Sequence, residues 1–277
     1  LELVTNHPQM TYYLGFLILI LGITYVVQAV KSKEFLSFFK ASAVLFTAAM
    51  FAFAMNATNL MATSEYTKES TRGKGELTIS SVGSPKAQST GLDKAYITQY
   101  SYGVLETFNL LIPRFMGGGN REDVGKDSET YKVIRAMGAS PLQALQISKE
   151  APMYWGDQPI VEAPAYIGAT VIFLFVFALF LYHGRFKWWL VTGVLISLLL
   201  SYGKNLAFLT HFFIDYVPLY NKFRAVSSIQ VILELCIPLL ATLGLTKLFQ
   251  KNISSASKLA ALKSSLGIVA GLTVLFL

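Results

Sequence analysis

Long runs without charged residues alternate with short polar connectors along most of the chain. Six apolar runs are present; five carry no charge, and residues 225–246 carry only Glu234. A helix needs about 20 apolar residues, within a range of roughly 17–25, to cross a bilayer core about 30 Å thick. We therefore expect a mainly α, polytopic membrane protein with about five to six spans. Their expected positions are about 10–30, 41–62, 165–183, 188–202 and 226–246, with a last run at 264–277.

A segment of different composition, residues 63–164, separates the first two expected spans from the others. It holds 12 of the 16 acidic residues of the chain. We expect residues 1–62 to form two membrane helices and 63–164 to form an insert of mixed helix and loop with little strand. Residues 165–277 should form three to four membrane helices with a surface or re-entrant segment near 203–225.

The distribution of basic residues predicts which side of the membrane the insert occupies. The chain carries 14% charged residues and a net charge of +7, but the insert holds 11 Lys and Arg against 12 acids. The positive excess therefore lies in the connectors beside the spans, which is typical of cytoplasmic loops. We expect the insert to be extracytoplasmic, and this distribution gives no support for nucleic-acid binding.

The sequence at both ends of the chain suggests that the series of apolar runs continues beyond it. The sequence does not begin with Met, and its last apolar run stops at Leu277. We expect the chain to be a piece of a larger protein, with further helices on both sides.

Within the insert, local patterns predict short elements. Residues 76–80 alternate as a short strand would, and 92–115 reads as a helix followed by an apolar surface segment. Pro141 suits the first turn of a helix. The triple glycine 117–119 lacks the spacing of a phosphate-binding loop and reads as a flexible hinge.

The end of the insert, Tyr154-Trp155-Gly156-Asp157-Gln158-Pro159, carries the strongest candidate chemistry. The Asp157 carboxylate could act as a base, hold a metal or bind sugar hydroxyls, with Trp155 and Tyr154 stacking on a sugar ring. The competing interpretation is a turn-forming aspartate. Glu106 is a second, less constrained candidate.

The segment before the span at 226–246, Pro218 to Arg224, carries a second group of candidates. Arg224 and Lys222 could bind a phosphate, with Lys204 joining them, and Tyr220 in the same segment is a candidate for binding the sugar or acceptor. The competing interpretation is that these cations contact lipid headgroups.

Glu234 lies within the apolar run 225–246, where an acid is costly and is a functional hypothesis by default. Pro238 follows four residues later, and a kink is expected there. A protonated or paired structural glutamate is the alternative. The three histidines are far apart and the chain has one cysteine, so no zinc site is predicted.

Several stretches together resemble the YfhO family of bacterial membrane proteins. They are SYGVLETFNLLIPRFMGG (101–118), YWGDQP with PAYIGA (154–169), SYGKN (201–205) and DYVPLYNKFRAVSSIQVILE (215–234). The family is similar to GT-C glycosyltransferases, which transfer a sugar from a polyprenyl-phosphate carrier to an extracytoplasmic acceptor such as a cell-envelope polymer.

The resemblance implies a multi-pass enzyme of the bacterial cytoplasmic membrane that acts with or without a divalent ion, Mg²⁺ or Mn²⁺. In such enzymes the catalytic acid usually lies in the first extracytoplasmic loop, which we expect upstream of this chain. The catalytic residue is therefore unassigned, with Asp157 and Glu106 as candidates here. A transporter or flippase of a lipid-linked glycan, or a scaffold of envelope assembly, is the alternative.

Overall fold

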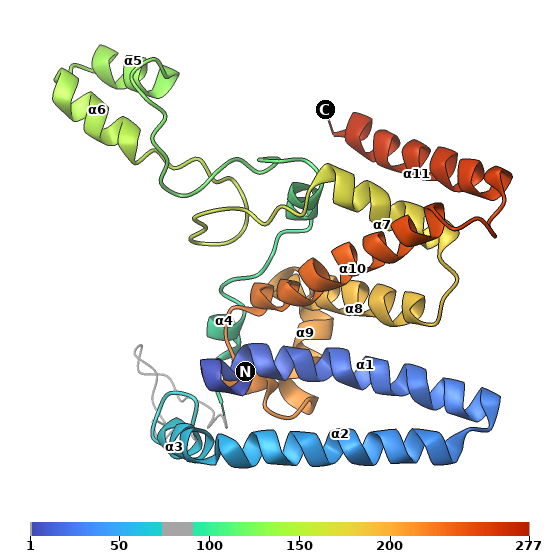
Figure 1. Ribbon diagram of the computed structural model, residues 1–277. Coiled ribbons are helices and arrows are strands. Elements are labelled where there is room, and N and C mark those ends of the chain that lie inside the picture. The colour runs from blue at the N-terminus through green and yellow to red at the C-terminus, as the bar shows by residue number, and fades with distance from the viewer. Residues whose placement is uncertain (1, 74–90, 277) are drawn as a thin grey trace.

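The computed structural model describes residues 2–73 and 91–276. Helices dominate this part of the chain, and it contains only two isolated β-bridges and no named strand. Most of the long helices run roughly along one direction, and the middle of the chain extends away from them (Figure 1). The predicted mainly α architecture is confirmed, whereas the predicted strand at 76–80 lies outside the described residues.

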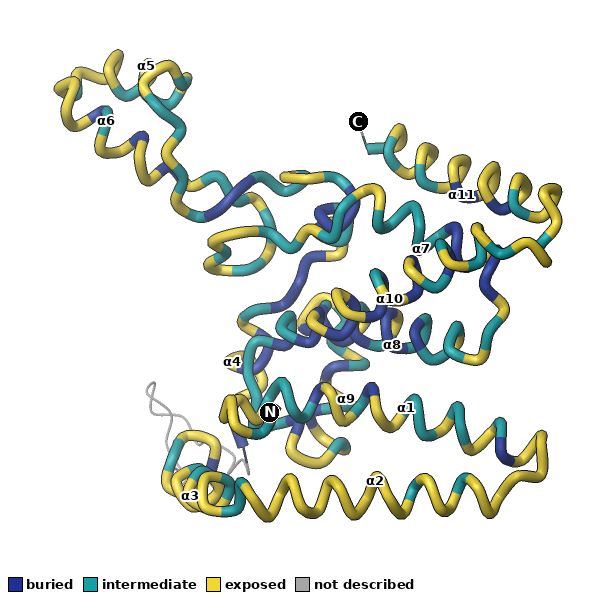
Figure 2. Tube along the Cα trace, viewed as in Figure 1, coloured by how far each residue is buried: buried dark blue, intermediate teal, exposed yellow. Residues whose placement is uncertain are grey.

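The first two helices form an antiparallel hairpin. α1 (Pro8–Ser32) ends at Lys33, which adopts a left-handed conformation, and α2 (Phe35–Met55) returns beside it. No residue of α2 is buried, and Figure 2 shows it exposed along its length. An apolar helix with such exposure is suited to contact with lipid.

The expected boundaries 41–62 for the second span are wrong. α2 begins six residues earlier and ends before Asn56, after which α3 (Ala57–Lys68) continues as a separate helix. Lys40 was taken as the edge of the apolar run, but a lysine near a helix end can extend its ammonium to the membrane surface.

Four helices pack together in the membrane part, and all but the last of them contribute to its main core. They are α7 (Ala169–Leu181), α8 (Phe186–Ser201), α10 (Val231–Leu248) and α11 (Ser255–Leu275). α10 contacts both α7 and α8, and α11 packs on α7. The buried core includes Leu190 of α8 and Leu233, Cys236 and Leu240 of α10, and α1 closes it through Tyr13 and Leu17.

Small residues allow these helices to approach closely. A Cβ atom at Gly244 of α10 would lie 2.4 Å from the Cβ of Ala178 in α7. At Gly193 of α8 it would lie 3.1 Å from the sulfur of Cys236. Close helix approach at small residues is typical of membrane bundles.

A sharp bend follows α8. The 3₁₀ turn η3 (Gly203–Leu206) leads into α9 (Ala207–Tyr216), and the segment Gly203–Tyr216 is bent by 107° relative to α8. Such a bent pair is a broken span or a re-entrant loop, so the surface or re-entrant segment near 203–225 stays a prediction. The 3₁₀ turns η4 (Tyr220–Lys222) and η5 (Val226–Gln230) then lead into α10.

Among the described residues, four helices are long and apolar enough to cross a membrane, or five if the bent pair is one span. The four lie at Pro8–Ser32, Phe35–Met55, Val226–Leu248 and Ser255–Leu275. A membrane protein with several spans is thus supported, and the expected number of five to six is reached only if the bent pair is one span. α7 has 13 residues, because the helix starts only after Gly168 with a φ of 109°, and it is shorter than the span expected at 165–183.

The described part of the insert consists of short elements. α4 (Lys94–Ile97) and the 3₁₀ turn η2 (Leu105–Leu110) replace the longer helix expected within 92–115. α5 (Glu129–Ala136) and α6 (Pro141–Lys149) form a helical hairpin that projects from the rest of the molecule (Figure 1). Pro141 occupies the first turn of α6, with Ser140 and Gln143 forming a capping box, as the sequence predicted.

The triple glycine is a packed turn, which corrects the expected flexible hinge. Gly118 donates its N–H to the carbonyl of Met153 at 2.7 Å, and Met153 donates to Gly119 at 2.9 Å. A Cβ at Gly117, whose φ is 81°, would lie 1.9 Å from the Met153 carbonyl oxygen. The glycines are needed because two backbone segments meet without room for side chains.

Replacing Gly117 by alanine is therefore expected to destabilise the insert. Gly125→Ala is a matched control, because its φ of 76° is similar but a Cβ there meets nothing within 4 Å. We expect Gly117→Ala to lower the thermal midpoint by roughly 2 °C or more beyond the control, measured by scanning fluorimetry in detergent. Equal midpoints in the two variants would contradict the packing described here.

The two ends of the bundle differ in charge. The connectors 32–34, 182–185 and 249–254 lie at one end, and the described insert, α4 and α9 lie at the other (Figure 1). The first end is basic, with Lys33 and Arg185 in its connectors and Lys251 beyond α10. The described insert and α9 thus lie at the same end of the bundle.

Candidate functional site

Glu106 is the centre of a hydrogen-bond network where the insert meets the bundle. Its side chain is buried, and the residue is 1% exposed. Its carboxylate accepts the N–H of Gly103 and the hydroxyl of Tyr154, and the N–H of Asp157 lies 3.4 Å from Oε2. The hydroxyl of Tyr102 donates to the Glu106 carbonyl at 2.7 Å. We call these five residues the Glu106 network.

The donors around Glu106 fill most of the capacity of its carboxylate. Burial of a carboxylate is costly unless its oxygens are hydrogen-bonded, and here two N–H groups and one hydroxyl supply the bonds. Glu106 therefore joins the turn at 103–106 to the turn at 154–158. In this structure the Glu106 side chain holds these two turns in position and is not accessible to solvent.

Two glycines make room for the Glu106 carboxylate. A Cβ at Gly156 would lie 2.4 Å from Oε1, and a Cβ at Gly103 would lie 2.9 Å from Oε2. The glycine in the Tyr154 to Pro159 segment is thus explained by the approach of a carboxylate from 50 residues earlier in the chain.

Asp157 presents an exposed carboxylate at the edge of this network. Its Oδ2 accepts the amide of Asn205 at 3.0 Å, and the same amide donates to the Tyr102 carbonyl at 2.9 Å. The side chain is thus oriented by one donor, and the residue is exposed. An exposed, oriented carboxylate can accept hydroxyl groups of a ligand or take a proton.

Tyr154 and Trp155 flank this carboxylate in different ways. Tyr154 is half-buried; burial and its hydrogen bond to Glu106 raise the pKa of its phenol, so it stays a donor. Trp155 is 69% exposed, and its backbone N–H donates to Met116 at 2.9 Å. An exposed indole on a fixed backbone can stack on the apolar face of a ligand.

Arg224 lies in a second group of polar residues, the arginine–tyrosine cluster. Its guanidinium carbon is 5.0 Å from the ring centre of Tyr96 and 5.8 Å from that of Tyr100, and it donates to the Tyr96 hydroxyl. Gln9 of α1 donates to the Arg224 carbonyl at 2.7 Å. Cation–π contacts hold the guanidinium in place and leave donors for an anion.

One segment of the insert connects the two groups. Residues 97–102 contact both the end of α8 and the turn before α10. The backbone N–H of Tyr102 donates to the Ser201 carbonyl at 2.9 Å, and the Tyr100 carbonyl accepts the N–H of Ser227 at 3.1 Å. Tyr100 contacts Arg224, and Tyr102 belongs to the Glu106 network. Because only Ser101 lies between Tyr100 and Tyr102, their Cα atoms are within about 7 Å of each other.

The remaining candidates lie apart from these groups. Lys222 donates its ammonium to the Arg72 carbonyl at 2.6 Å, and the Lys204 side chain is exposed while its N–H donates to Ser101. Tyr220 is 2% exposed and packs against Phe213. Burial raises the pKa of Tyr220 and keeps its ring inside the core rather than open to a ligand.

Glu234 lies in the first turn of α10 on an exposed face, and α10 continues through Pro238. The 3₁₀ turn at 226–230 precedes α10, and both belong to the candidate span Val226–Leu248, which contains Glu234.

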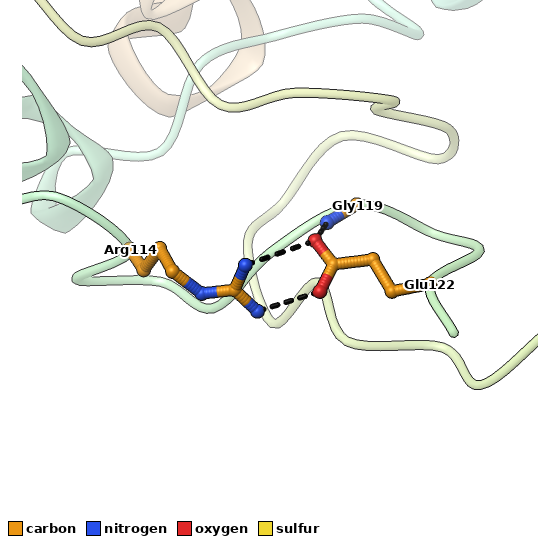
Figure 3. Close-up of polar contacts among 3 residues, drawn as sticks. All are labelled: Arg114, Gly119 and Glu122. Atoms are coloured by element: carbon orange, nitrogen blue, oxygen red, sulfur yellow. Dashed lines mark hydrogen bonds and ion pairs between the residues drawn. The ribbon is translucent and has the colours of Figure 1, made fainter. Parts of the chain in front are cut away.

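An ion pair braces the turn that supports Trp155. Arg114 and Glu122 form a two-point contact, 2.6 Å at its shorter bond, and Gly119 donates to Glu122 at 2.7 Å (Figure 3). The Arg114 guanidinium and this N–H lower the pKa of the Glu122 carboxyl. The pair is partly exposed, so its effect is mainly on local geometry.

Within residues 2–73 and 91–276 no group of three or more His, Cys, Asp or Glu side chains is arranged to hold an ion. The carboxylates nearest to one another in the site are Asp157 and Glu106, and the latter is occupied by protein donors.

Sequence reasoning missed Asn205, Tyr96 and Tyr100 as site residues. Asn205 stands in SYGKN, one of the stretches that carries the family resemblance, and this was the available signal. The two tyrosines are two of 14 in the chain and had no distinguishing local pattern.

Comparisons of this chain with protein-family models, with curated proteins and with solved structures find no match. The class that the fold itself defines is a multi-pass α-helical membrane protein with a polar site at one end of its helices.

Proposed function

We propose that the protein is a membrane glycosyltransferase that takes a sugar from a polyprenyl-phosphate carrier and transfers it to a cell-envelope acceptor. The observation that carries this proposal is Asp157, an exposed carboxylate oriented by Asn205 beside the exposed indole of Trp155. It lies at one end of apolar helices, where a carrier lipid would present its head group.

Asp157 and Trp155 suit the sugar or acceptor side of such a site. Carboxylates and stacked aromatic rings are the groups that bind sugar hydroxyls and the apolar face of a pyranose. Arg224 suits the donor phosphate, because its planar guanidinium offers two parallel hydrogen bonds and its tyrosine contacts hold it in place. Lys204, which is exposed, is a second cation for this role. Lys222 and Tyr220 instead make contacts within the protein, with Arg72 and Phe213.

The chemistry assigned to these groups is a displacement at the anomeric carbon. The acceptor oxygen forms a bond to this carbon as its bond to the phosphate oxygen breaks. The electron pair passes to the phosphate, where Arg224 stabilises the charge, and the hydroxyl proton passes to a carboxylate. Asp157 is the candidate for this base in the described chain, and a loop preceding the chain is the alternative that the family resemblance implies. Bound Mg²⁺ or Mn²⁺ would supply further charge at the phosphate.

The expected location is the bacterial cytoplasmic membrane, with the insert on the extracytoplasmic side. Support comes from the basic connectors gathered at the opposite end of the bundle, since such loops favour the cytoplasm.

Arg224→Ala is expected to weaken binding of polyprenyl phosphate about tenfold or more, because a charge-assisted pair to phosphate is lost. Arg224→Lys should recover only part of the affinity, since it keeps the charge but not the fork. Binding is measured by native mass spectrometry on the full-length protein, with Arg121→Ala as an exposed control. Equal affinity in wild type and Arg224→Ala would rule out this phosphate site.

A transporter or flippase of lipid-linked glycan is the second candidate. Glu234 favours it, because an exposed acid on an otherwise apolar spanning helix marks a polar path or partner. Transport that depends on Glu234 without sugar release would favour this alternative.

A further inference from the structure

A pocket lies at the basic end of the bundle, away from the Glu106 network. It has a volume of about 250 Å³ and opens between α7, α11 and the end of α10. Its apolar lining consists of Phe173, Leu174 and Phe177 of α7, Leu248 of α10, and Leu259 and Leu262 of α11. The remaining lining residue is Lys258.

Two lysines beside this pocket contact the same residue. Lys258, which lines the pocket, donates its ammonium to the Gln250 carbonyl at 2.8 Å, and Lys247, which precedes the lining residue Leu248, donates to the Gln250 side-chain oxygen at 2.9 Å. Gln250 therefore binds two like charges. Such an arrangement is unfavourable unless water or an anion screens the charges.

The surrounding sequence offers these lysines no acidic partner nearby along the chain. Residues 163–214 and 235–277, which include all of α7, α8 and α11, contain no Asp or Glu. Lys251, exposed in the turn after α10, adds a third positive charge at the same end. Within residues 2–73 and 91–276 none of these lysines forms an ion pair, so an apolar pocket beside them is complementary to a lipid with an anionic head group.

We propose that this pocket binds an anionic phospholipid of the bilayer, with an acyl chain against α7 and α11 and the phosphate held by Lys247 and Lys258. Basic pockets between membrane helices on the cytoplasmic side are typical sites for anionic head groups. The apolar lining accounts for the chain, and Gln250 positions the two ammonium groups that receive the phosphate. This site is independent of the proposed transfer chemistry, which lies at the other end of the helices.

The test is native mass spectrometry of the full protein, released from detergent with phosphatidylglycerol or phosphatidylcholine added in equal amounts. Wild type should retain phosphatidylglycerol in preference to phosphatidylcholine. The double variant Lys247→Gln/Lys258→Gln should retain roughly tenfold to thirtyfold less phosphatidylglycerol, since each lysine near the phosphate contributes measurably. Lys263→Gln, an exposed lysine of α11 outside the pocket lining, is the matched control and should behave as wild type.

A second variant tests the apolar part. Leu262→Trp should reduce retention of phosphatidylglycerol by filling the pocket, with both lysines intact. Added inorganic phosphate should not displace the lipid, because it lacks the chain; displacement would assign the cations to free phosphate and overturn the lipid site. Equal retention of the two lipids by wild type, or no change in the double variant, would also overturn the proposal.

Discussion

Replacing Glu106 by alanine is expected to destabilise the junction between the insert and the bundle more than any other single carboxyl substitution in the described chain. The change leaves the N–H of Gly103 and the hydroxyl of Tyr154 without their acceptor. Each buried donor left unpaired costs about 1–3 kcal/mol. The thermal midpoint in detergent should therefore fall by roughly 5 °C or more.

The matched comparison uses two further variants. Glu106→Gln keeps the shape and one acceptor oxygen, so its midpoint should lie between wild type and Glu106→Ala. Glu129→Ala removes a carboxylate that is 83% exposed and pairs only with Lys132 on the same helix, so its midpoint should stay near wild type. An unchanged midpoint in Glu106→Ala would show that the network contributes nothing to stability.

Asp157→Asn is expected to give the opposite pattern, with activity lost and stability kept. The residue is exposed, and its contact to Asn205 can be replaced by an amide oxygen at little cost. The amide cannot accept a proton, and general-base contributions are typically about 10²–10⁴-fold. We expect sugar transfer to fall at least about 100-fold with a midpoint near wild type. A fall in both together would assign Asp157 to structure, as the turn-forming interpretation of the sequence holds.

The membrane helices were predictable because the signal is local. A run of uncharged residues long enough to span the bilayer forces a helix, since no other structure satisfies its backbone there. The errors lie at the edges, as at Lys40 and at Gly168, where a single charge or a positive φ decides the boundary. The ends of a helix depend on single residues, so the sequence determines them less strongly than it determines the apolar run between them.

The site was only partly predictable because its contacts join distant parts of the chain. Asp157, Trp155 and Arg224 were singled out by residue type and location. The bond from Tyr154 to Glu106 spans 48 residues, and the contact from Arg224 to Tyr96 spans 128. No local pattern encodes such pairings, and Glu106 was therefore ranked below Asp157 although it organises the site.

The triple glycine shows the same limit. Three consecutive glycines are most simply interpreted as a flexible hinge, and their packing against Met153 and Glu162 becomes visible only in three dimensions. Glycine suits both a flexible hinge and a site where two backbone segments approach closely, so the residue type alone does not tell these two cases apart.

We propose that the chain belongs to an enzyme that cleaves the sugar–phosphate bond of a polyprenyl-phosphate sugar at the Asp157 end of its helices. The most direct test is to incorporate the full-length protein into liposomes with a panel of polyprenyl-phosphate hexoses and envelope glycan acceptors, and to measure the polyprenyl phosphate released. We predict release from at least one hexose by wild type and by Asp123→Asn, a second insert aspartate that only holds the N–H of Gly125. Asp157→Asn should not release it. Equal release by Asp157→Asn and wild type, or no release from any donor while Glu234-dependent lipid transport is present, would contradict the account.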